Sequence, residues 1–356
     1  MARPVCRAYR RCATGFRPGL STVVGMKLRW LLLGLLVTAL LVPAFLLTGD
    51  RLLDPQGGTW VRLIAFTPYA VLLYTAALLP LLLAWWRGDG FWRGTARLLV
   101  VVSLVGMLLH AFWASGPFVG TPAADAASPH RLHVMTANLR FGQADTPRVV
   151  EVALADDVDV LVLQEVTPEA LSGLEAAGLD QALEHRAGRP ADGPAGTMVF
   201  SRYPLRSVHR LATMFGSYAM DVRTPAGRIH LLAVHPRPPI GDVTGWRTDQ
   251  GVVRHAARAT SERTLVVGDL NATMDHVPMR SLVGIGFEDA ATQADSQWQP
   301  TWPAAGEVSR LGFSVPSLVS IDHVLLSKGM RALHTESVTV QDTDHRALVA
   351  TVAVSR

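Results

Sequence analysis

The first third of the chain contains three long apolar stretches, Trp30–Leu47, Leu63–Trp86 and Leu98–Val119. The hydrocarbon core of a bilayer is about 30 Å thick and takes roughly 17–25 residues of α-helix to cross, so each stretch is long enough to span a membrane. None shows the polar face at helical spacing that a helix on the surface of a water-soluble domain would need. We therefore predict three transmembrane helices within residues 30–119.

Three prolines and one ionisable residue interrupt these stretches. Pro43, Pro68 and Pro80 are expected to kink the helices rather than end them, because neighbouring helices in a membrane can satisfy the freed carbonyl groups. His110 is the only His, Lys, Arg, Asp or Glu within the three stretches. We interpret it as a neutral, hydrogen-bonded packing residue rather than as a functional group.

Charge predicts the orientation of these helices. Residues 1–29 carry seven Lys and Arg and no Asp or Glu, and the loop Gly88–Arg97 adds two more arginines against one aspartate. Because positively charged flanks stay in the cytoplasm, the tail over residues 1–29 is predicted to be cytoplasmic and everything after Val119 extracytoplasmic. This describes a multi-pass protein of the cell membrane. The alternative for the first stretch is a cleaved signal peptide on a chain that starts at Met26, which leaves the later topology unchanged.

The residues after the apolar region have a different composition. Gly, Pro, Ala and Ser are frequent between Gly116 and His130, which predicts a linker over residues 120–130. From His130 onward there are 21 Lys and Arg against 25 Asp and Glu, so the positive charge of the whole chain comes from its tail and not from a nucleic-acid-binding face. The only cysteines, Cys6 and Cys12, also lie in the tail. We expect no disulfide-linked partner and no cysteine-ligated zinc in this domain.

Strand-like and helix-like segments alternate after the linker. Leu132–Leu139 and Val158–Gln164 have the apolar character of buried strands, and Thr146–Asp156 and Thr167–Gly178 have helical periodicity after a Thr-Pro start. Further strands are predicted downstream, with a helix over Thr244–Ala259. The pattern predicts a mixed α/β domain over residues 131–356 with helices outside two sheets.

Polar side chains follow several of these strands at the point where each strand ends. They are Asn138, Glu165, His235, Asp269 with Asn271, Asp322, and Asp344 with His345. Each alone has an ordinary structural explanation, such as a turn or a hydrogen-bonded edge residue. Their repeated position at strand ends predicts one shared site at an edge of the sheets.

These residues also carry a resemblance to a known family. Asn138, Gln164-Glu165, Ser201-Arg202-Tyr203-Pro204, His235, Gly268-Asp269-Leu270-Asn271, Ile321-Asp322-His323 and Asp344-His345-Arg346 resemble, in order, the motifs of the endonuclease/exonuclease/phosphatase superfamily. That superfamily includes deoxyribonuclease-like nucleases, sphingomyelinases and inositol polyphosphate phosphatases. The resemblance covers residues 131–355 and implies a four-layer α/β/β/α sandwich with a metal-dependent site, here preceded by three transmembrane helices.

The resemblance implies a role for each site residue. Glu165 would be the main ligand of Mg²⁺, with Mn²⁺ as the alternative ion, helped by Asn138 and Asp344. Asp322 would orient His345, and Asp269 with Asn271 would position the attacking water, while His235 would donate to the phosphoryl oxygen. Whether His345 or Asp269 is the general base stays open at this stage.

One position departs from the family pattern. Arg140 stands two residues after Asn138, where many of the nucleases carry an acid, which favours an additional anionic group on the substrate. The sequence thus predicts a membrane-anchored, outward-facing Mg²⁺-dependent phosphoesterase that acts on nucleic acid or on a lipid headgroup. The alternative is a non-catalytic, membrane-tethered binding module of the same fold. A transporter is disfavoured, because three helices with one ionisable residue offer no charged path. The oligomeric state is not predicted.

Overall fold

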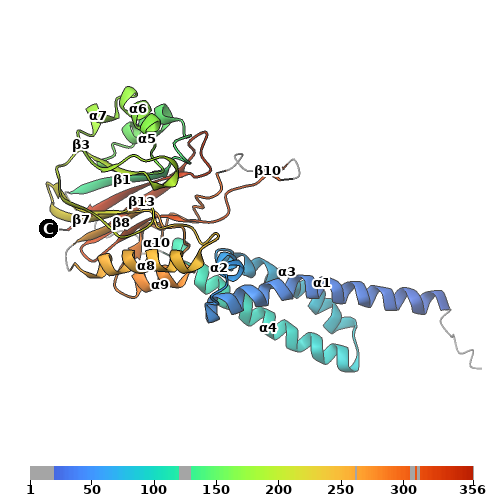
Figure 1. The fold of residues 1–356 in the computed structure, drawn as a ribbon. Coiled ribbons are helices and arrows are strands. Elements are labelled where there is room, and N and C mark those ends of the chain that lie inside the picture. Colours follow the sequence, from blue (N-terminus) through green and yellow to red (C-terminus); the bar gives the residue numbers. More distant parts are fainter. Residues whose placement is uncertain (1–19, 120–129, 261–262, 305–308, 311–312, 356) are drawn as a thin grey trace, which may run out of the picture.

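The computed structural model describes residues 20–119, 130–260, 263–304, 309–310 and 313–355. They form two parts, which we call the helix bundle (residues 20–119) and the sandwich domain (residues 130–355) (Figure 1). The predicted linker over residues 120–129 and most of the predicted basic tail, residues 1–19, lie outside the described residues.

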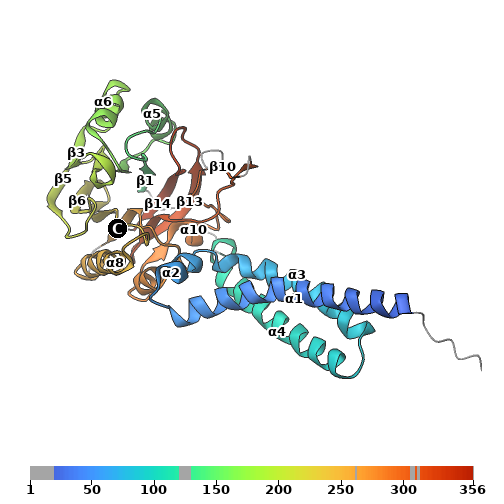
Figure 2. The same cartoon turned by 45° about the vertical axis from the view of Figure 1, so that its right-hand side comes forward.

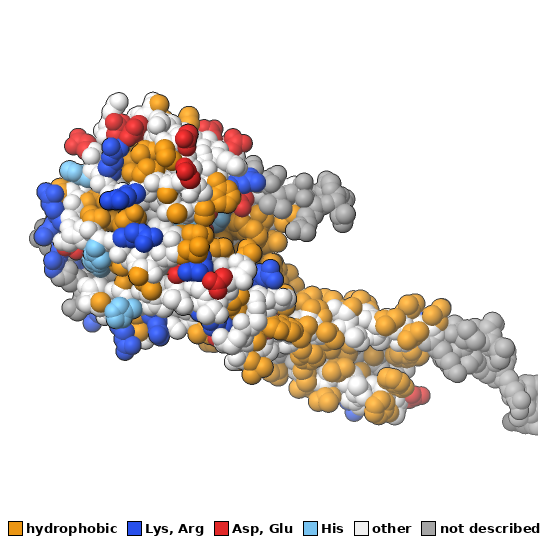
Figure 3. Space-filling model, viewed as in Figure 1, with side chains coloured by type: hydrophobic (Ala, Val, Ile, Leu, Met, Phe, Trp, Pro, Cys, Tyr) orange, Lys and Arg blue, Asp and Glu red, His pale blue; other side chains and the backbone are white. Residues whose placement is uncertain are grey.

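The helix bundle contains the three long apolar helices expected from the sequence. They are α1 (Leu20–Leu53), α3 (Ala70–Arg87) and α4 (Gly90–Ala114), and segments Leu28–Leu53, Thr67–Arg87 and Gly90–Ala114 are long and apolar enough to cross a membrane. Their surface is largely apolar, whereas the surface of the sandwich domain is mixed (Figure 3).

Two short elements, α2 (Gly58–Ile64) and η1 (Thr67–Tyr69), connect α1 to α3. Pro43 and Pro80 lie inside α1 and α3, as expected. The expectation that Pro68 kinks a continuous helix is wrong. The chain turns after α2 and Pro68 lies in η1, at the start of the second long helix, where a missing N–H leaves no helical hydrogen bond unmade.

A small polar cluster lies inside the bundle. The His110 ring is fully buried and bonds to Thr48 Oγ1 through Nε2 and to the Thr67 carbonyl through Nδ1, each at 2.9 Å. Thr48 Oγ1 also lies 2.9 Å from the Tyr74 hydroxyl. The cluster ties α1, α3, α4 and η1 together.

The sandwich domain consists of two six-stranded sheets, in the orders β13-β14-β1-β2-β4-β3 and β5-β6-β7-β8-β12-β9. The first sheet is formed by β1 (Arg131–Asn138), β2 (Val160–Gln164), β3 (His185–Arg189), β4 (Thr197–Ser201), β13 (Met330–Val338) and β14 (Ala347–Val354). The second is formed by β5 (Leu205–Arg210), β6 (Tyr218–Thr224), β7 (Gly227–Val234), β8 (Thr264–Asp269), β9 (Glu288–Asp289) and β12 (Asp322–Leu326). A separate pair, β10 (Ser309–Arg310) and β11 (Phe313–Ser314), projects from the domain (Figure 1).

Helices cover the outer face of each sheet, which gives the predicted four-layer α/β/β/α sandwich (Figure 1). The first sheet is covered by α5 (Thr146–Ala155), α6 (Pro168–Ala176) and α7 (Leu179–Ala182), and the second by α8 (Val243–Arg258) and α9 (Val277–Val283); α10 (Ala290–Gln293) lies beside β12 and β13. Apolar side chains of alternate strand positions fill the space between the sheets, and those of the opposite faces pack under the helices. These three clusters hold the strand ends in fixed positions.

The two parts of the molecule are docked directly on each other. Arg51 Nε at the end of α1 lies 2.6 Å from Asp275 Oδ1, and Arg247 Nη1 in α8 lies 3.0 Å from Asp54 Oδ2. The imidazole of His276 bonds to the Val61 carbonyl at 2.9 Å, and the Val61 side chain belongs to the apolar cluster under α8 and α9. Figure 2 shows α2 beside α8.

Candidate active site

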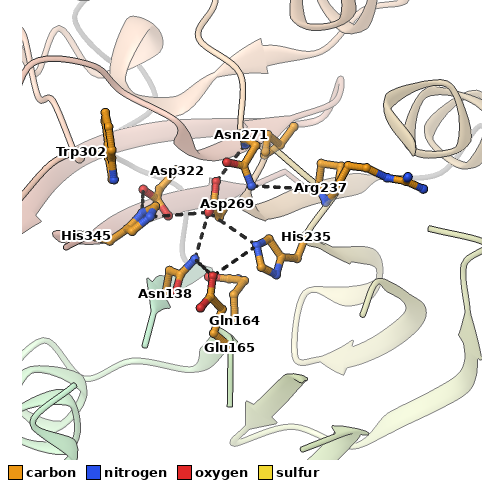
Figure 4. Close-up of polar contacts among 12 residues, drawn as sticks. Asn138, Gln164, Glu165, His235, Arg237, Asp269, Asn271, Trp302, Asp322 and His345 are labelled. Carbon is orange, nitrogen blue, oxygen red and sulfur yellow. Dashed lines mark hydrogen bonds and ion pairs between the residues drawn. The ribbon is translucent and has the colours of Figure 1, made fainter. Parts of the chain in front are cut away.

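The polar residues predicted from strand ends gather at one edge of the sandwich, which we call the site edge (Figure 4). Parallel pairing of β1 with β2 places Asn138 opposite Gln164, so that Glu165 follows at the same level. In the second sheet, antiparallel pairing of β12 with β8 places Asp322 opposite Asp269. Asn138 and Glu165 at the end of the first sheet therefore face Asp269 and Asp322 at the end of the second.

The backbone at two of these strand ends adopts conformations that turn the chain sharply. Glu165 has φ +58° and Asn271 has φ +48°, in the left-handed region. Gly268 has φ +145°, and a Cβ there would lie 2.0 Å from the Val234 carbonyl oxygen. Only glycine fits at this position, where β8 passes close to β7 before Asp269.

Asn138 links the two sheets. Its Nδ2 donates to Glu165 Oε1 at 3.1 Å and to Asp269 Oδ2 at 3.0 Å. Its Oδ1 accepts the Arg140 amide at 2.9 Å, which fixes the orientation of the side chain. The amide therefore holds the two carboxylates together in a buried position.

Asp322 and His345 form a buried acid–imidazole pair. Nδ1 of His345 lies 2.9 Å from Asp322 Oδ2, and its Nε2 lies 3.7 Å from Asp269 Oδ2. Burial alone would lower the pKa of His345, but the charges of Asp322 and Asp269 raise it to about 10. At neutral pH the ring is an imidazolium whose Nε2 points into the site.

Asp269 is a buried carboxyl group with a strongly raised pKa. Burial raises its pKa to about 7; the charge of Asp322 acts in the same direction and that of His345 opposes it. Its Oδ1 accepts the amide of Asn271 at 2.8 Å, while its Oδ2 faces Asn138, His345 and His235. A carboxyl group with a pKa near neutrality can both accept and return a proton.

His235 lies on the other side of Asp269. Its Nε2 is 3.7 Å from Asp269 Oδ2 and 3.9 Å from Glu165 Oε1, and the Phe215 ring packs against it at 5.0 Å between centroids. Burial and the charge of His345 lower the pKa of His235 to about 3, so the ring is neutral. Its Nδ1 is buried without a hydrogen-bond partner among the residues that the structure describes.

Glu165 and Asp344 complete the site. Glu165 Oε2 accepts the Phe141 amide at 2.7 Å, and Asp344 Oδ2 accepts the Trp302 indole N–H at 3.2 Å. Burial raises the pKa of Glu165, the bonds from Asn138 and Phe141 oppose this, and the charge of Asp344 adds to it. The carboxylates of Glu165 and Asp344 thus repel each other in this partly buried site.

Comparisons with known proteins show the family to which the chain belongs. Residues 135–345 match the sequence model of the Endonuclease/Exonuclease/phosphatase family. The chain belongs to this family. A search of curated protein sequences gives no match.

Solved structures share the fold of the family with the sandwich domain. TDP2 of D. rerio, humanized by 14 mutations, is 15% identical, with 62% of this chain and 98% of that chain covered and a TM-score of 0.51. D. rerio TDP2 complexed with single strand DNA product has 14% identity, the same coverage and a TM-score of 0.51. A family protein from Bacteroides thetaiotaomicron has 13% identity, coverage of 64% and 99%, and a TM-score of 0.50.

The donor chemistry of the site fits a divalent cation. Glu165, Asn138 and Asp344 offer oxygen ligands, as Mg²⁺ prefers, and a cation bound there would offset the burial of the Glu165 carboxylate, which raises its pKa, and the smaller effect of the Asp344 charge. Ligand atoms of Asp269, Asp322 and His345 also lie within 4.8 Å of one another. That set is the poorer fit for Mg²⁺, because a cation there would compete with the proton that His345 shares with Asp322.

Not every residue of the predicted motifs enters the site. His323 turns away and bonds to Asp289 Oδ1 at 3.0 Å, and Arg346 bonds to Ser337 and Thr339. The Asn271 side chain donates to the Pro236 carbonyl at 3.1 Å, so it braces the His235 loop. These side chains position the strands around the site.

Two aromatic residues of the site were not predicted. Trp302 holds Asp344 and Phe215 covers His235. Both lie far in sequence from the residues they contact, and no local pattern marks them. Arg140, which departs from the family pattern, has φ +46° in the loop that carries Phe141.

Proposed function

We propose that the protein is a membrane-anchored, divalent-metal-dependent hydrolase of phosphate esters whose sandwich domain lies outside the cytoplasm. The observation that carries this proposal is the arrangement around Asp269, a buried carboxyl group with a pKa near 7 between an imidazolium and a neutral imidazole. Several ionisable groups with shifted pKa values that converge on one buried place are typical of catalytic sites.

Glu165, Asn138 and Asp344 would hold the cation, which we propose to be Mg²⁺. When bound, it would neutralise charge on the phosphoryl oxygens. Asp269 would take the proton of the attacking water, because burial raises the pKa of its carboxyl group to about 7. Asn271 holds Asp269 in place through its backbone amide.

The two histidines have separate roles in this proposal. His345, kept protonated by Asp322, would donate through Nε2 to the phosphoryl group as negative charge develops. His235 is neutral and would donate a hydrogen bond to the phosphoryl oxygen from the other side of Asp269. We therefore propose Asp269, rather than His345, as the general base that the sequence left open.

The membrane anchor and its sidedness rest on the helix bundle. The turn between α3 and α4 lies at the end of the bundle farthest from the sandwich domain (Figure 1), and Arg87, Arg93 and Arg97 surround it. The first described residue, Leu20 at the start of α1, lies at this end as well, so the positive-inside rule favours a cytoplasmic position for it and the opposite position for the sandwich domain.

The test is hydrolysis of bis-p-nitrophenyl phosphate by the full-length chain in detergent. We expect turnover that requires Mg²⁺ or Mn²⁺ and falls by about 10²–10⁴-fold in Asp269→Asn. Metal-independent turnover, or full turnover in Asp269→Asn, would contradict the proposal. Metal binding without any turnover of phosphate esters would instead indicate the non-catalytic binding module.

A further inference from the structure

We infer that the site edge faces the bilayer that the helix bundle crosses, and that the substrate is a phosphate ester of a lipid in the adjoining leaflet. This inference rests on the proposed function and names its substrate class. It is carried by strand direction, by the docking of the bundle, by exposed apolar side chains and by the position of the arginines.

Strand direction places the site edge on the side toward the bundle. The Val354 amide donates to the His130 carbonyl, and Arg263 bonds to the Ser355 carbonyl, so β1 and β8 both begin beside the carboxyl terminus. That terminus lies at the end of the domain farthest from the helices (Figure 1). Asn138 and Asp269, at the other ends of the same strands, therefore lie on the side toward which the helices extend.

The bundle docks on the loops that carry the site. Asp275 and His276, which bond to Arg51 and to the Val61 carbonyl, follow Asp269 by six and seven residues. Leu318, whose carbonyl accepts the Tyr69 hydroxyl at 2.6 Å, precedes Asp322 by four. The docking surface and the site edge thus belong to the same end of the sandwich.

This docking fixes the angle between the two parts. Besides the ion pairs, the Gln297 amide donates to the Pro117 carbonyl at 2.9 Å, and the Tyr69 hydroxyl donates to the Leu318 carbonyl. A cavity of about 130 Å³ remains between them, bordered by Arg51, Trp113 and Asp322. A domain held this way cannot rotate freely to present its site to bulk water.

Exposed apolar side chains surround the site edge. Phe141, Met214 and Ile240, which we call the apolar rim, are 53%, 59% and 65% exposed. Phe141 follows Asn138 by three residues, and Ile240 lies between His235 and the start of α8, where Val243 Cγ2 would lie 3.1 Å from a Cβ on Gly58 of the bundle. Large apolar side chains on loops beside membrane helices are expected to enter the interface of the bilayer.

Arg202, Arg210 and Arg237 do not form a track for a polyanion at this edge. The Arg202 amide donates to the Asp159 carbonyl, just before β2 begins, which places Arg202 at the opposite edge from Glu165. Near the site, Arg237 pairs with Asp242 and Asp249, and Arg210 bonds to the carbonyls of Thr213 and Met214. A nucleic acid would need several phosphate contacts beside the site. A single lipid headgroup has one phosphate at the site and does not need such additional contacts.

The inferred reaction is hydrolysis of one phosphate ester bond of the lipid. Water attacks the phosphorus of a phospholipid, and the bond between phosphorus and the diacylglycerol oxygen breaks. One proton of the water is transferred to the diacylglycerol oxygen, and the resulting diacylglycerol stays in the membrane. The oxygen of the water stays on the phosphorus of the released headgroup.

The first test measures the depth of the apolar rim and needs no substrate. In the full chain with Cys6→Ser and Cys12→Ser, a single Ile240→Cys would be labelled with an environment-sensitive fluorophore in phosphatidylcholine and phosphatidylglycerol vesicles. Leu154→Cys is the matched control, because Leu154 is 52% exposed but lies at the end of α5 toward the opposite edge. We expect several-fold stronger quenching by nitroxide lipids at position 240. Equal quenching at both positions would overturn the inference.

The second test asks which lipids are reached. Full-length protein would be reconstituted into vesicles of phosphatidylcholine, phosphatidylglycerol and phosphatidic acid, with a radiolabel in the headgroup phosphate either in the same vesicles or in separate ones. We expect water-soluble phosphate release from the same vesicles only. The variant Met214→Ser/Ile240→Ser should lower the ratio of lipid to bis-p-nitrophenyl phosphate turnover about tenfold, and Leu154→Ser should leave it unchanged.

The outcomes separate this inference from the proposed function. If bis-p-nitrophenyl phosphate is not hydrolysed either, the proposed function fails. If that ester is hydrolysed but single-stranded DNA is cut and lipid is not, only the lipid inference fails. Equal release from separate vesicles would also overturn it, because the site would then be open to the bulk solution.

Discussion

His110 in the helix bundle and His345 at the site edge are both buried among polar side chains, yet their surroundings differ. Both ring nitrogens of His110 bond to neutral oxygens, those of Thr48 and of the Thr67 carbonyl. His345 bonds to a carboxylate and faces a second one, and Asp322 Oδ1 is buried without a partner among the described residues. A neutral, fully paired cluster can fasten helices together, whereas charged groups with unused capacity are suited to bind a ligand.

The comparison is tested most strongly by removing the charged ring. His345→Ala should lower turnover of bis-p-nitrophenyl phosphate by about 10²–10⁴-fold, because the donor to the phosphoryl group is lost. Metal binding should remain, since the proposed ligands are other residues. A steady-state rate near that of the wild type would show that His345 is only structural.

A second test compares two similar acid–histidine pairs. Asp322→Asn removes the charge that keeps His345 protonated, and we expect turnover to fall about 10–100-fold. Asp289→Asn is the matched control, because Asp289 Oδ1 lies 3.0 Å from Nδ1 of His323, which points away from the site. Its turnover should stay near wild type. Equal losses in the two variants would mean that any buried pair supports the rate only through stability.

The junction between the two parts gives a test by pH. Burial lowers the pKa of His276 to about 4, whereas a ring exposed by opening of the junction has an ordinary pKa of about 6.5. Docking is therefore fully stable above about pH 6.5 and weakens as the pH falls toward 4, by about 2 kcal/mol at pH 5. Hydrogen exchange in α2 should report this loss. His276→Gln keeps a donor for the Val61 carbonyl without titrating, so a loss of the same size in that variant would rule out His276 as the cause.

The smallest effect is expected inside the bundle. His110→Leu removes the bonds to Thr48 and to the Thr67 carbonyl and should lower the free energy of unfolding in detergent by about 1 kcal/mol. Turnover of the soluble ester should change by less than about twofold, the normal effect of a distant substitution. A much larger drop in turnover at unchanged stability would give His110 a functional role.

The sequence predicted the features that depend on local pattern. Asn138, Glu165 and Asp269 each follow an apolar strand that ends abruptly in a polar residue. Because neighbouring strands that run parallel end at the same edge of a sheet, the local pattern alone predicts that such residues lie close together. Long apolar runs likewise mark the helices. Pro68 was misplaced because the turn after Ile64 is stabilised by tertiary contacts, among them the bond from His276 to Val61.

Long-range contacts could not be predicted in this way. Trp302 meets Asp344 across 42 residues and Arg247 meets Asp54 across 193, and nothing in the local sequence of either pair indicates its partner. For the same reason the sequence predicted a tether of residues 120–130 but not the docked junction. The direction in which the site faces follows from that junction.

The most direct test of the proposed site is a metal titration of the full-length chain in detergent, with Mn²⁺ binding followed by electron paramagnetic resonance and ester hydrolysis measured in the same samples. We predict that binding and turnover rise together in the wild type, that Glu165→Gln loses both, and that His345→Ala loses only turnover. Unchanged binding and turnover in Glu165→Gln would contradict the assignment of the site edge as the metal-dependent catalytic centre.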